Sequence, residues 1–374
     1  MTMKFFACVV GARPNFMKMA PILRALRAYP QIRPILIHTG QHYDPQLSDV
    51  FFQDLEMPRP DVHLNVGSGT HAQQTARILE KMEEVLLAGT PEGKKFDRVI
   101  VVGDVNSTMA AALAAVKLGI PVAHVEAGLR SFDRSMPEEI NRIVTDAVAD
   151  MLFVSEPSGV ENLRREGHSE EQIHLVGNVM IDTLLALLPR AREIGTPQRL
   201  GLSVGEYAVV TLHRPSNVDH AEALSGLLEV LAEVAAELPV VFPIHPRTRQ
   251  RIETFGLGHL LDGQGSGSRR IWALPPLGYL EFLSLTSQAK VVITDSGGLQ
   301  EESTALGIPC LTVRPNTERP ITVSEGTSTL VGNDPVKLRC YLEDVLAGRY
   351  KTGKCPSLWD GHAAERIGER LANG

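Results

Sequence analysis

The chain has 374 residues, of which 43% are hydrophobic and 22% are charged, as in an ordinary globular protein long enough for two domains. Its formal net charge of −7 argues against general nucleic-acid binding, which needs a concentrated basic surface. No uninterrupted apolar run reaches the ~18 residues of a membrane span, and no signal-peptide pattern opens the sequence, so we expect a cytoplasmic protein without a membrane partner. The four cysteines form no Cys-x-x-Cys pair, which predicts reduced, structural thiols.

Short apolar runs rich in Val and Ile alternate with helical patterns along the whole chain, which is typical of parallel α/β units. In the first half we predict strands at 5–10, 33–38, 98–103, 121–125, 151–154 and 173–176, and helices at 17–28, 71–87, 107–118, 138–148 and 158–166. The second half repeats the scheme, with strands at 207–212, 239–243, 270–273, 290–293 and 309–313 and helices at 220–236, 278–287, 298–306 and 334–346. The pattern predicts two doubly wound, Rossmann-like domains that join between Gly177 and Pro197, with a ligand site in the interdomain cleft.

Two acidic residues follow strands of the first predicted domain. The strand at 98–103 leads into Asp104, and the strand at 121–125 leads into Glu126. Both carboxylates should lie at the carboxyl edge of one sheet, where open α/β folds bind ligands. Carboxylates brought together in a cleft raise each other's proton affinity, which separates acid from base roles at neutral pH. For Asp104 a helix cap is an equally good interpretation, because an Ala-rich helix follows it.

Titratable groups also stand at a helix start and at a strand end. Pro137-Glu138-Glu139 begins a helix, where acids complement the helix dipole. The following Asn141-Arg142 exceeds that explanation and makes a polar face with both signs of charge. In the second half, the strand at 207–212 leads into His213-Arg214, and histidine titrates near neutrality without special help. We interpret His213 as a general acid or as a group that neutralises a departing phosphate.

The segment that follows the strand at 290–293 is nearly bare of side chains. Ser296-Gly297-Gly298 begins a helix, and two glycines in a first turn cost roughly 1 kcal/mol each relative to Ala. Their advantage is that a ligand can approach unpaired backbone N–H groups at the positive end of the helix. We therefore predict a phosphate site, with a structural turn as the alternative, and note that Leu299 stands where a capping box would have its acid. One turn further along, Glu302 could accept both hydroxyls of a ribose.

Cofactor and metal signals are weak. No G-x-G-x-x-G fingerprint stands between a predicted strand and a predicted helix, so bound NAD is not indicated. His38 and His42 have the spacing of a zinc pair on a helix, but Gly40 and the preceding strand argue against a helix there. We predict neither a cofactor nor a metal.

An ordered set of short motifs runs along the chain. It consists of Gly11-Ala12-Arg13-Pro14, Lys18-Met19-Ala20-Pro21, Gln41-His42, Gly103-Asp104, His124-Val125-Glu126-Ala127-Gly128-Leu129-Arg130, Pro137-Glu138-Glu139, Asn141-Arg142, Gly177-Asn178, His213-Arg214, Asp295 to Glu302 and Thr317-Glu318-Arg319-Pro320. Together these motifs resemble the UDP-N-acetylglucosamine 2-epimerase family of the non-hydrolysing type. The resemblance implies a glycosyltransferase-B-like fold and a homodimer. It also implies a first domain at 1–176, a UDP-binding domain at 177–354, and a last helix, within 355–374, that crosses back to the first domain.

The resemblance further implies that the protein reversibly converts UDP-GlcNAc to UDP-ManNAc without a redox cofactor. A base removes the C2 proton while UDP leaves C1, and the resulting 2-acetamidoglucal takes a proton on its opposite face as UDP returns. Two faces require two proton-handling groups. The family pattern assigns catalysis to Asp104, Glu126, Glu138 and His213, and substrate binding to Arg13, Lys18, Arg142, His245, Ser296, Gly297, Gly298, Glu302 and Arg319.

Several positions depart from the commonest family form: Ala12 replaces Thr, Asn15-Phe16 replaces Glu-Ala, Tyr43-Asp44 replaces Arg-Glu, and Pro215 replaces a second Arg. Gln41 and His42 lie in the region where many bacterial members bind a second UDP-sugar as an activator, and the departures argue against such activation. Four alternatives stay open. They are a 2-epimerase of a modified UDP-sugar such as a diacetamido-uronate, a hydrolysing epimerase that releases ManNAc and UDP, a glycosyltransferase, and a sensor that binds without turnover.

Overall fold

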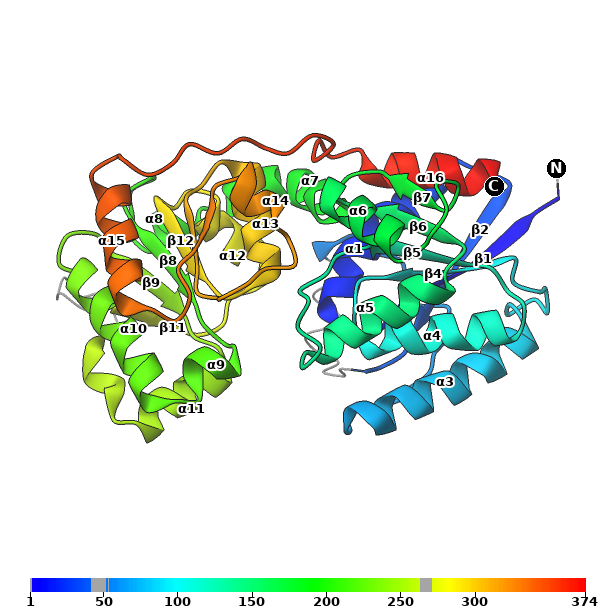
Figure 1. The fold of residues 1–374 in the computed structure, drawn as a ribbon, viewed down its shortest axis with the longest axis horizontal. Coiled ribbons are helices and arrows are strands. Elements are labelled where there is room, and N and C mark those ends of the chain that lie inside the picture. Colours follow the sequence, from blue (N-terminus) through cyan, green and yellow to red (C-terminus); the bar gives the residue numbers. More distant parts are fainter. Residues whose placement is uncertain (1, 42–51, 53, 263–270) are drawn as a thin grey trace. The chain divides into compact units, whose positions relative to one another are not determined.

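The computed structural model describes residues 2–41, 52, 54–262 and 271–374. The chain forms two compact units, Met1–Ala186 with Ser357–Gly374 (unit 1) and Leu187–Pro356 (unit 2). Each unit is a parallel α/β domain, as the alternating pattern predicts (Figure 1). The units divide within one continuous helix, α7 (Val179–Ile194), whereas the sequence placed the boundaries at 176/177 and 354/355.

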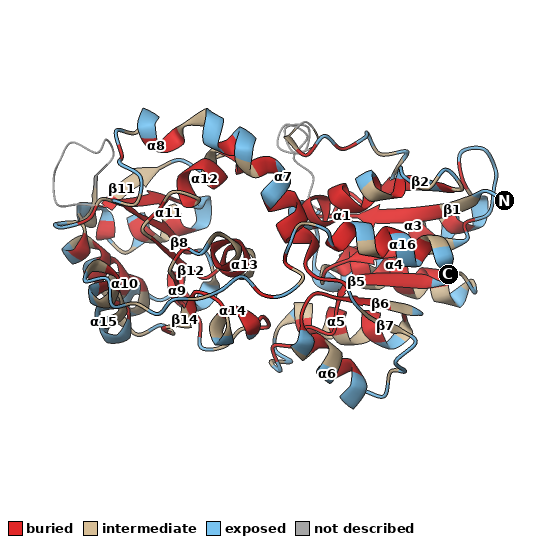
Figure 2. Cartoon of the chain, turned by 90° about the horizontal axis from the view of Figure 1, so that it is seen from above, coloured by how far each residue is buried: buried red, intermediate tan, exposed pale blue. Residues whose placement is uncertain are grey.

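The described part of unit 1 holds a parallel sheet of seven strands in the order β3-β2-β1-β4-β5-β6-β7. Its elements are β1 (Lys4–Val10), α1 (Arg13–Leu26), β2 (Ile32–His38), β3 (Val62–His63), α3 (His71–Ala88), β4 (Arg98–Val102), α4 (Asn106–Lys117), β5 (Val122–Ala127), α5 (Pro137–Val148), β6 (Met151–Val154), α6 (Pro157–Arg165), β7 (Ile173–Leu175), the first part of α7, and α16 (Ala363–Asn373). The central strands are Val- and Ile-rich because helices bury both of their faces (Figure 2). The strand order reverses between β1 and β4, and ligands of such folds bind at the carboxyl ends beside this reversal.

Unit 2 repeats the plan within its described residues, with the strand order β10-β11-β9-β8-β12-β13-β14. Its elements are α8 (Thr196–Arg199), β8 (Ala208–Thr211), α9 (Pro215–Val218), α10 (Ala221–Val234), β9 (Val240–Pro243), α11 (Pro246–Thr254), η1 (Leu257–Leu260), β10 (Leu261–Asp262), β11 (Ile271–Leu274), α12 (Tyr279–Thr286), β12 (Val291–Thr294), α13 (Gly297–Leu306), β13 (Cys310–Thr312), α14 (Ile321–Ser324), β14 (Ser328–Leu330) and α15 (Pro335–Leu346). Here the order reverses between β8 and β12. The residues that follow these two strands are therefore the place to look for a ligand site.

Several of the elements that the sequence did not predict are short or nearly polar. β3, β10 and β14 are edge strands of two or three residues, too short to produce an apolar run. Helix α11 buries only Thr248 and Ile252, so it has no apolar stripe. Helix α1 begins at Arg13 rather than at the predicted position 17, because Pro14 is well tolerated in a first helical turn.

The C-terminal helix α16 packs within unit 1 against α1. Asp182, on α7, caps it by accepting hydrogen bonds from the backbone N–H groups of Ala363 (3.2 Å) and Ala364 (2.7 Å). Just before the helix, the indole N–H of Trp359 donates to the carbonyl of Ser155 at 3.0 Å. These bonds make the end of the chain a structural part of unit 1.

His38, at the end of β2, is buried among aromatic rings. Its ring stacks on Phe16 with centroids 5.4 Å apart and lies equally far, 5.4 Å, from His63. Among the described residues, neither ring nitrogen has a hydrogen-bond partner. Burial, followed by the nearby His63, lowers the pKa of His38 to about 4. The folded protein therefore holds this ring neutral at neutral pH.

The lowered pKa predicts a pH-dependent loss of stability. Below the ordinary histidine pKa the unfolded chain takes up a proton that the folded chain refuses, so stability falls as the pH drops from about 6.5 towards 4. Between pH 7 and pH 5 this group should cost on the order of 2 kcal/mol. Urea unfolding at both pH values should show that His38→Phe removes this part of the pH dependence, whereas the same change at the exposed His220 leaves it intact. Equal pH dependence in wild type and His38→Phe would contradict the buried neutral ring.

Candidate functional site

The carboxyl edge of the unit 1 sheet brings Asp104 together with helix α5. Arg142 donates to Asp104 Oδ2 from Nη2 at 2.6 Å and to Glu139 Oε2 from Nη1 at 2.8 Å. The Asn141 side chain also donates to the backbone carbonyl of Asp104 at 2.8 Å. The side chain of Asp104 keeps 22% of its surface exposed, whereas that of Arg142 keeps 4%. Arg142, predicted as a substrate contact, thus holds the candidate acid or base in place.

The capping interpretation of Asp104 is wrong. The N-cap residue of α4 is Val105, and no side chain of that residue caps the helix. The side-chain oxygen of Gln41 does this work instead, because it accepts from the backbone N–H of Ser107 at 3.1 Å and from its hydroxyl at 2.7 Å. Gln41 is buried, and its side-chain oxygen is used in these hydrogen bonds. His42, its predicted partner in an activator site, lies outside the described residues.

Glu126 occupies an irregular position in β5. The pairing of β5 with β6 shifts register between Val125 and Ala127, so Glu126 is the extra residue of a β-bulge, with φ of 73°. A left-handed backbone at a residue other than Gly costs on the order of 1 to 3 kcal/mol and is concentrated at functional sites. Bulges are over-represented next to active sites, where they re-aim a side chain, so Glu126 stays a candidate functional residue.

Lys18 reaches this bulge from α1. Its Nζ lies 2.7 Å from Glu126 Oε1, and both side chains are almost completely buried. The lysine passes close to Gly103, where an added Cβ would lie 2.8 Å from Nζ and where φ is +69°. Gly103 is therefore needed both for the turn after β4 and for this approach. Lys18, predicted as a substrate contact, is the ion-pair partner of Glu126.

The two glutamates at the start of α5 differ in their surroundings. Glu139 is buried and accepts hydrogen bonds from the backbone of Ser131 (2.9 Å) and Phe132 (2.8 Å) as well as from Arg142. Glu138, the predicted catalytic residue, is half-buried. Glu139 thus fixes the turn before α5, and Glu138 is the more accessible carboxylate of the pair.

Arg13, predicted as a substrate contact, is the exposed first residue of α1.

In unit 2, the strand ends beside the reversal carry a histidine and an aspartate. Asp295 Oδ1 lies 2.7 Å from His213 Nδ1, and Oδ2 accepts from the backbone N–H groups of His213 (2.9 Å) and Arg214 (2.8 Å). Burial raises the pKa of Asp295, but the hydrogen bond and charge of His213 and the two backbone bonds outweigh it and hold that pKa below its usual value. The ionised carboxylate therefore fixes the imidazole through Nδ1, while the His213 side chain keeps 45% of its surface exposed.

The sequence interpretation gave no role to Asp295. Its position offered a signal for a site residue, because it comes directly after β12. Asp104 similarly comes two residues after the end of β4. His245 lies nearby, with its ring centroid 6.3 Å from that of His213, and its Nδ1 accepts from the backbone N–H of Arg247 at 3.3 Å. His245 thus caps the N-terminus of α11.

Helix α13 begins with the Ser-Gly-Gly turn. Ser296 is its N-cap residue, and its side chain makes no capping hydrogen bond. A Cβ added to Gly297 would lie 2.6 Å from Arg319 Nη1, whereas a Cβ added to Gly298 would meet nothing within 4 Å. The turn is therefore packed on one side and open on the other, as a site for phosphate requires.

Buried groups support this turn. Arg319 lies 2.7 Å from Glu301 through Nε and also pairs with Glu318, so its charge is balanced within the protein. Glu302 is buried as well and accepts a hydrogen bond from the Tyr279 hydroxyl at 2.9 Å. Tyr279 was not anticipated from the sequence, because nothing in its local pattern distinguishes it from a core residue.

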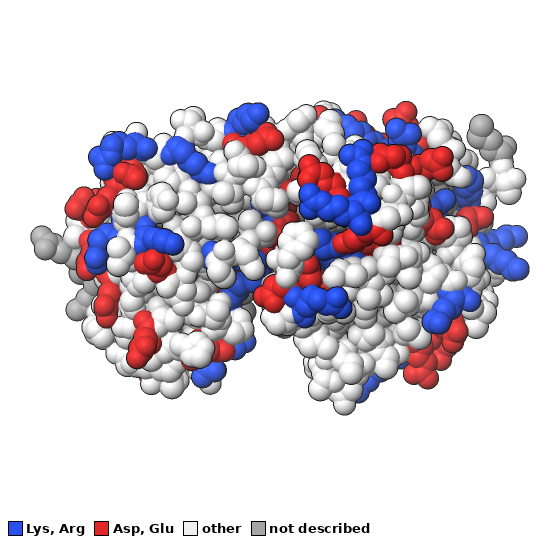
Figure 3. Space-filling view, in the orientation of Figure 1, with Lys and Arg blue, Asp and Glu red and all other residues white. Residues whose placement is uncertain are grey.

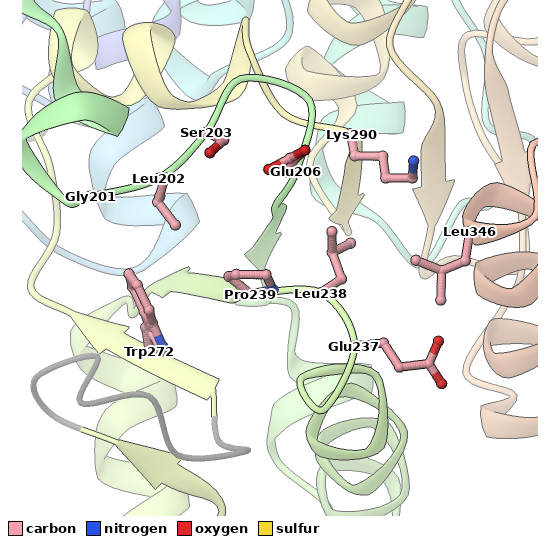
Figure 4. A pocket seen from close by; sticks show the side chains of 10 residues that line it. All are labelled: Gly201, Leu202, Ser203, Glu206, Glu237, Leu238, Pro239, Trp272, Lys290 and Leu346. Carbon is pink, nitrogen blue, oxygen red and sulfur yellow. The ribbon is translucent and has the colours of Figure 1, made fainter.

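A separate hollow of about 520 Å³ lies at the opposite, amino end of the unit 2 strands (Figure 4). It is lined by Gly201, Leu202, Ser203, Glu206, Glu237, Leu238, Pro239, Trp272, Lys290 and Leu346. None of these is a predicted site residue. The hollow also lies at the wrong end of the sheet for a nucleotide of an open α/β fold.

The surface and composition of the described residues add three observations. On the face shown in Figure 3, basic and acidic side chains are interspersed rather than gathered into a basic field. No described helix combines the length and apolar character that a bilayer crossing requires. The described residues also contain no cluster of three or more His, Cys, Asp or Glu side chains suited to a metal ion.

Comparison with known proteins gives a consistent result. A family model described as UDP-N-acetylglucosamine 2-epimerase matches residues 24–372. A UDP-N-acetylglucosamine 2-epimerase of Methanocaldococcus jannaschii is 42% identical over 371 residues, which cover 98% of each chain. A UDP-2,3-diacetamido-2,3-dideoxy-D-glucuronate 2-epimerase of Pseudomonas aeruginosa is 39% identical over 375 residues, which cover 97% of this chain and 98% of the other.

Solved structures agree with these relatives. The crystal structure of Methanocaldococcus jannaschii UDP-GlcNAc 2-epimerase in complex with UDP-GlcNAc and UDP aligns with a TM-score of 0.86 and 41% identity, over 99% of this chain and 100% of that chain. The predicted fold class, two doubly wound domains of the glycosyltransferase-B-like kind, is thereby confirmed.

Proposed function

Because the chain belongs to the UDP-N-acetylglucosamine 2-epimerase family, as the sequence motifs predicted, we propose that it reversibly converts UDP-GlcNAc to UDP-ManNAc without releasing the sugar. The observation that carries this proposal is the pair of carboxylates at the carboxyl edge of unit 1. Asp104 and Glu126 each have a cationic partner, Arg142 and Lys18 respectively. Inversion of a carbon by exchange of its hydrogen needs two such groups, one for each face.

The chemistry balances without a redox cofactor. One carboxylate removes the C2 proton while the C1–O bond breaks, so the C–H electrons form the C1=C2 double bond of a 2-acetamidoglucal and the C–O electrons leave with UDP. A proton is then delivered to the opposite face of C2 as a β-phosphate oxygen adds back to C1. Expulsion of UDP makes loss of this proton feasible, because C2 has no neighbouring carbonyl to stabilise a carbanion.

Unit 2 supplies groups suited to the departing diphosphate. The open turn at Gly298 offers backbone N–H groups at a helix start. His213, fixed by Asp295, presents Nε2 as a donor to a phosphate oxygen whose negative charge grows as the bond breaks. Glu302, held by Tyr279, is the proposed ribose contact. The remaining assigned roles, the homodimer and the cytoplasmic location are parts of the same proposal.

A second candidate substrate is a nucleotide of a diacetamido-glucuronate. The Pseudomonas aeruginosa relative, named as acting on a diacetamido-glucuronate nucleotide, is nearly as similar to this chain as the Methanocaldococcus jannaschii relative. Both reactions require the same exchange at C2. We propose UDP-GlcNAc as the substrate because the aligned solved structure is of a protein bound to it.

Product analysis tests the proposed function. Incubation with UDP-GlcNAc should yield a stable mixture of UDP-GlcNAc and UDP-ManNAc, with no accumulation of free ManNAc or UDP. Release of ManNAc and UDP in equal amounts would identify the hydrolysing alternative. Turnover of the diacetamido-glucuronate nucleotide alone would identify the modified-sugar alternative, and transfer to an added acceptor would identify a glycosyltransferase.

A further inference from the structure

A completely buried histidine and aspartate, His124 and Asp146, lie beneath the carboxylate edge of unit 1. His124 is on β5 and Asp146 is on α5, and each has 0% of its side-chain surface exposed. His124 Nδ1 lies 2.6 Å from Asp146 Oδ1, and His124 Nε2 lies 2.9 Å from the backbone carbonyl oxygen of Gly103. The proposed proton exchange uses neither residue directly.

Hydrogen-bond chemistry fixes the direction of each contact. A carbonyl oxygen can only accept, so Nε2 donates to Gly103. Burial alone would raise the pKa of Asp146, but the charge and hydrogen bond of His124, then Arg130 and the backbone N–H of Gly128, hold it below its ordinary value. The ionised carboxylate can only accept, so Nδ1 donates as well, and His124 bridges two acceptors.

The contacts of this pair lead to both candidate carboxylates. Gly103 is the residue before Asp104, and its carbonyl belongs to the peptide that joins them. Asp146 Oδ2 accepts from the backbone N–H of Gly128 at 3.0 Å, two residues after Glu126. An added Cβ at Gly128 would lie 2.4 Å from the carbonyl oxygen of Gly159, so this turn has little room to shift. The His124–Asp146 pair therefore hydrogen-bonds to the backbone close to both Asp104 and Glu126.

Such anchoring is functionally useful here because Glu126 adopts a strained backbone. A left-handed residue in a bulge persists only when its surroundings over-determine it. His124 lies before the bulge and Gly128 after it, so the pair fixes the chain on both sides. Arg130 adds an ion pair to Asp146, with Nη2 2.7 Å from Oδ2.

We propose that His124 and Asp146 are positioning residues for C2 proton exchange, acting through the backbone of Gly103 and Gly128 to hold Asp104 and Glu126 at the distances the two faces of the sugar require. This inference rests on the proposed function. Misplacement of a reacting group by about 1 Å can cost roughly 100-fold in rate.

Two substitutions at one position provide the test. The amide nitrogen of Gln reaches the place of Nε2 and can still donate to Gly103, whereas that of Asn reaches only the place of Nδ1. His124→Asn should therefore lower kcat for C2 exchange about 100-fold, and His124→Gln no more than about 10-fold. Asp146→Asn, which weakens the anchor at Gly128, should also lower kcat about 100-fold. KM for UDP-GlcNAc and Kd for UDP should stay within about threefold of the wild-type values, because the substrate contacts are untouched.

The outcomes separate positioning from simple structural support. Equal loss of kcat in His124→Asn and His124→Gln, a loss that follows the fraction of folded protein, or a rise in KM at unchanged kcat would overturn the inference. If His124→Asn does not fold, Asp146→Asn is compared with His124→Gln in its place. If neither His124→Asn nor Asp146→Asn folds, the inference is also overturned. Absence of C2 exchange in the wild-type protein would instead reject the proposed function, on which the inference depends.

Discussion

Replacing Asp104 by Asn should lower the rate of C2 exchange by about 1,000-fold while leaving UDP affinity unchanged, since loss of one general acid or base typically costs 100- to 10,000-fold. The amide keeps the shape of the side chain, and its oxygen can still accept from Arg142, which lies 2.6 Å from the native carboxylate. It cannot exchange a proton with the sugar. Rates from proton NMR and UDP affinities from calorimetry provide the two measurements.

Asp97 offers a matched control beside the same strand, at its other end. It precedes β4 at the amino edge, where its carboxylate accepts from the backbone N–H of Phe5 at 2.7 Å. Asp97→Asn makes the same chemical change at the end of the strand that carries no proposed chemistry, so exchange should continue at the wild-type rate. Retention of more than a tenth of the activity in Asp104→Asn, or a parallel loss of UDP affinity, would contradict the assigned role.

Gly298→Ala should weaken UDP binding about 10- to 100-fold without destabilising the free protein. A Cβ at Gly298 meets nothing within 4 Å, so the free helix α13 accepts it. Alanine also favours the helix by up to about 1 kcal/mol. The same methyl group would occupy the space proposed for a phosphate, and such overlap costs about 1 to 3 kcal/mol. The midpoint of thermal unfolding should therefore stay the same or rise, whereas the UDP affinity measured by titration should fall.

Gly258 is the matched control for this substitution. It also belongs to unit 2, and a Cβ added there meets nothing within 4 Å. Gly258→Ala should leave UDP affinity unchanged. Gly297→Ala differs from both, because its Cβ would collide with Arg319 at 2.6 Å and should destabilise the protein even without ligand. Full UDP affinity in Gly298→Ala would show that phosphate does not approach this turn.

The sheet edges could be predicted from the sequence because buried parallel strands are continuous apolar runs and end where polar residues begin. The run Val99 to Val102 and the run Val291 to Ile293 are both followed within a few residues by an aspartate. In a parallel sheet, all such ends lie on one edge. The positions of Asp104, Glu126, His213 and the Ser-Gly-Gly turn at carboxyl edges follow from this rule alone.

The partners of these residues could not be predicted in the same way. Lys18 and Glu126 are 108 positions apart, and Asp104 and Arg142 are 38 positions apart. Their pairing depends on how helices pack over the sheet, which hydrophobic periodicity does not encode. The family resemblance assigned Lys18 and Arg142 to substrate binding, which stays a prediction, and the structure adds that each pairs with a carboxylate of the protein.

The helix-cap interpretation of Asp104 failed for a related reason. An acid a few residues before an Ala-rich helix is a common capping pattern. In the structure the cap comes from Gln41, which lies 66 positions away from Ser107 in the chain. Gln41 accepts from a backbone N–H at the helix start, and the carboxylate of Asp104 accepts from Arg142.

The position of an isotope in the β-phosphate gives the most direct test of bond cleavage between C1 and UDP. UDP-GlcNAc labelled with ¹⁸O in the oxygen that bridges C1 and the β-phosphate is incubated with the protein, and ³¹P NMR follows the label. If UDP departs and returns, the label should move into the non-bridging β-phosphate positions while UDP-ManNAc forms. Formation of UDP-ManNAc with all of the label still in the bridge would contradict the elimination.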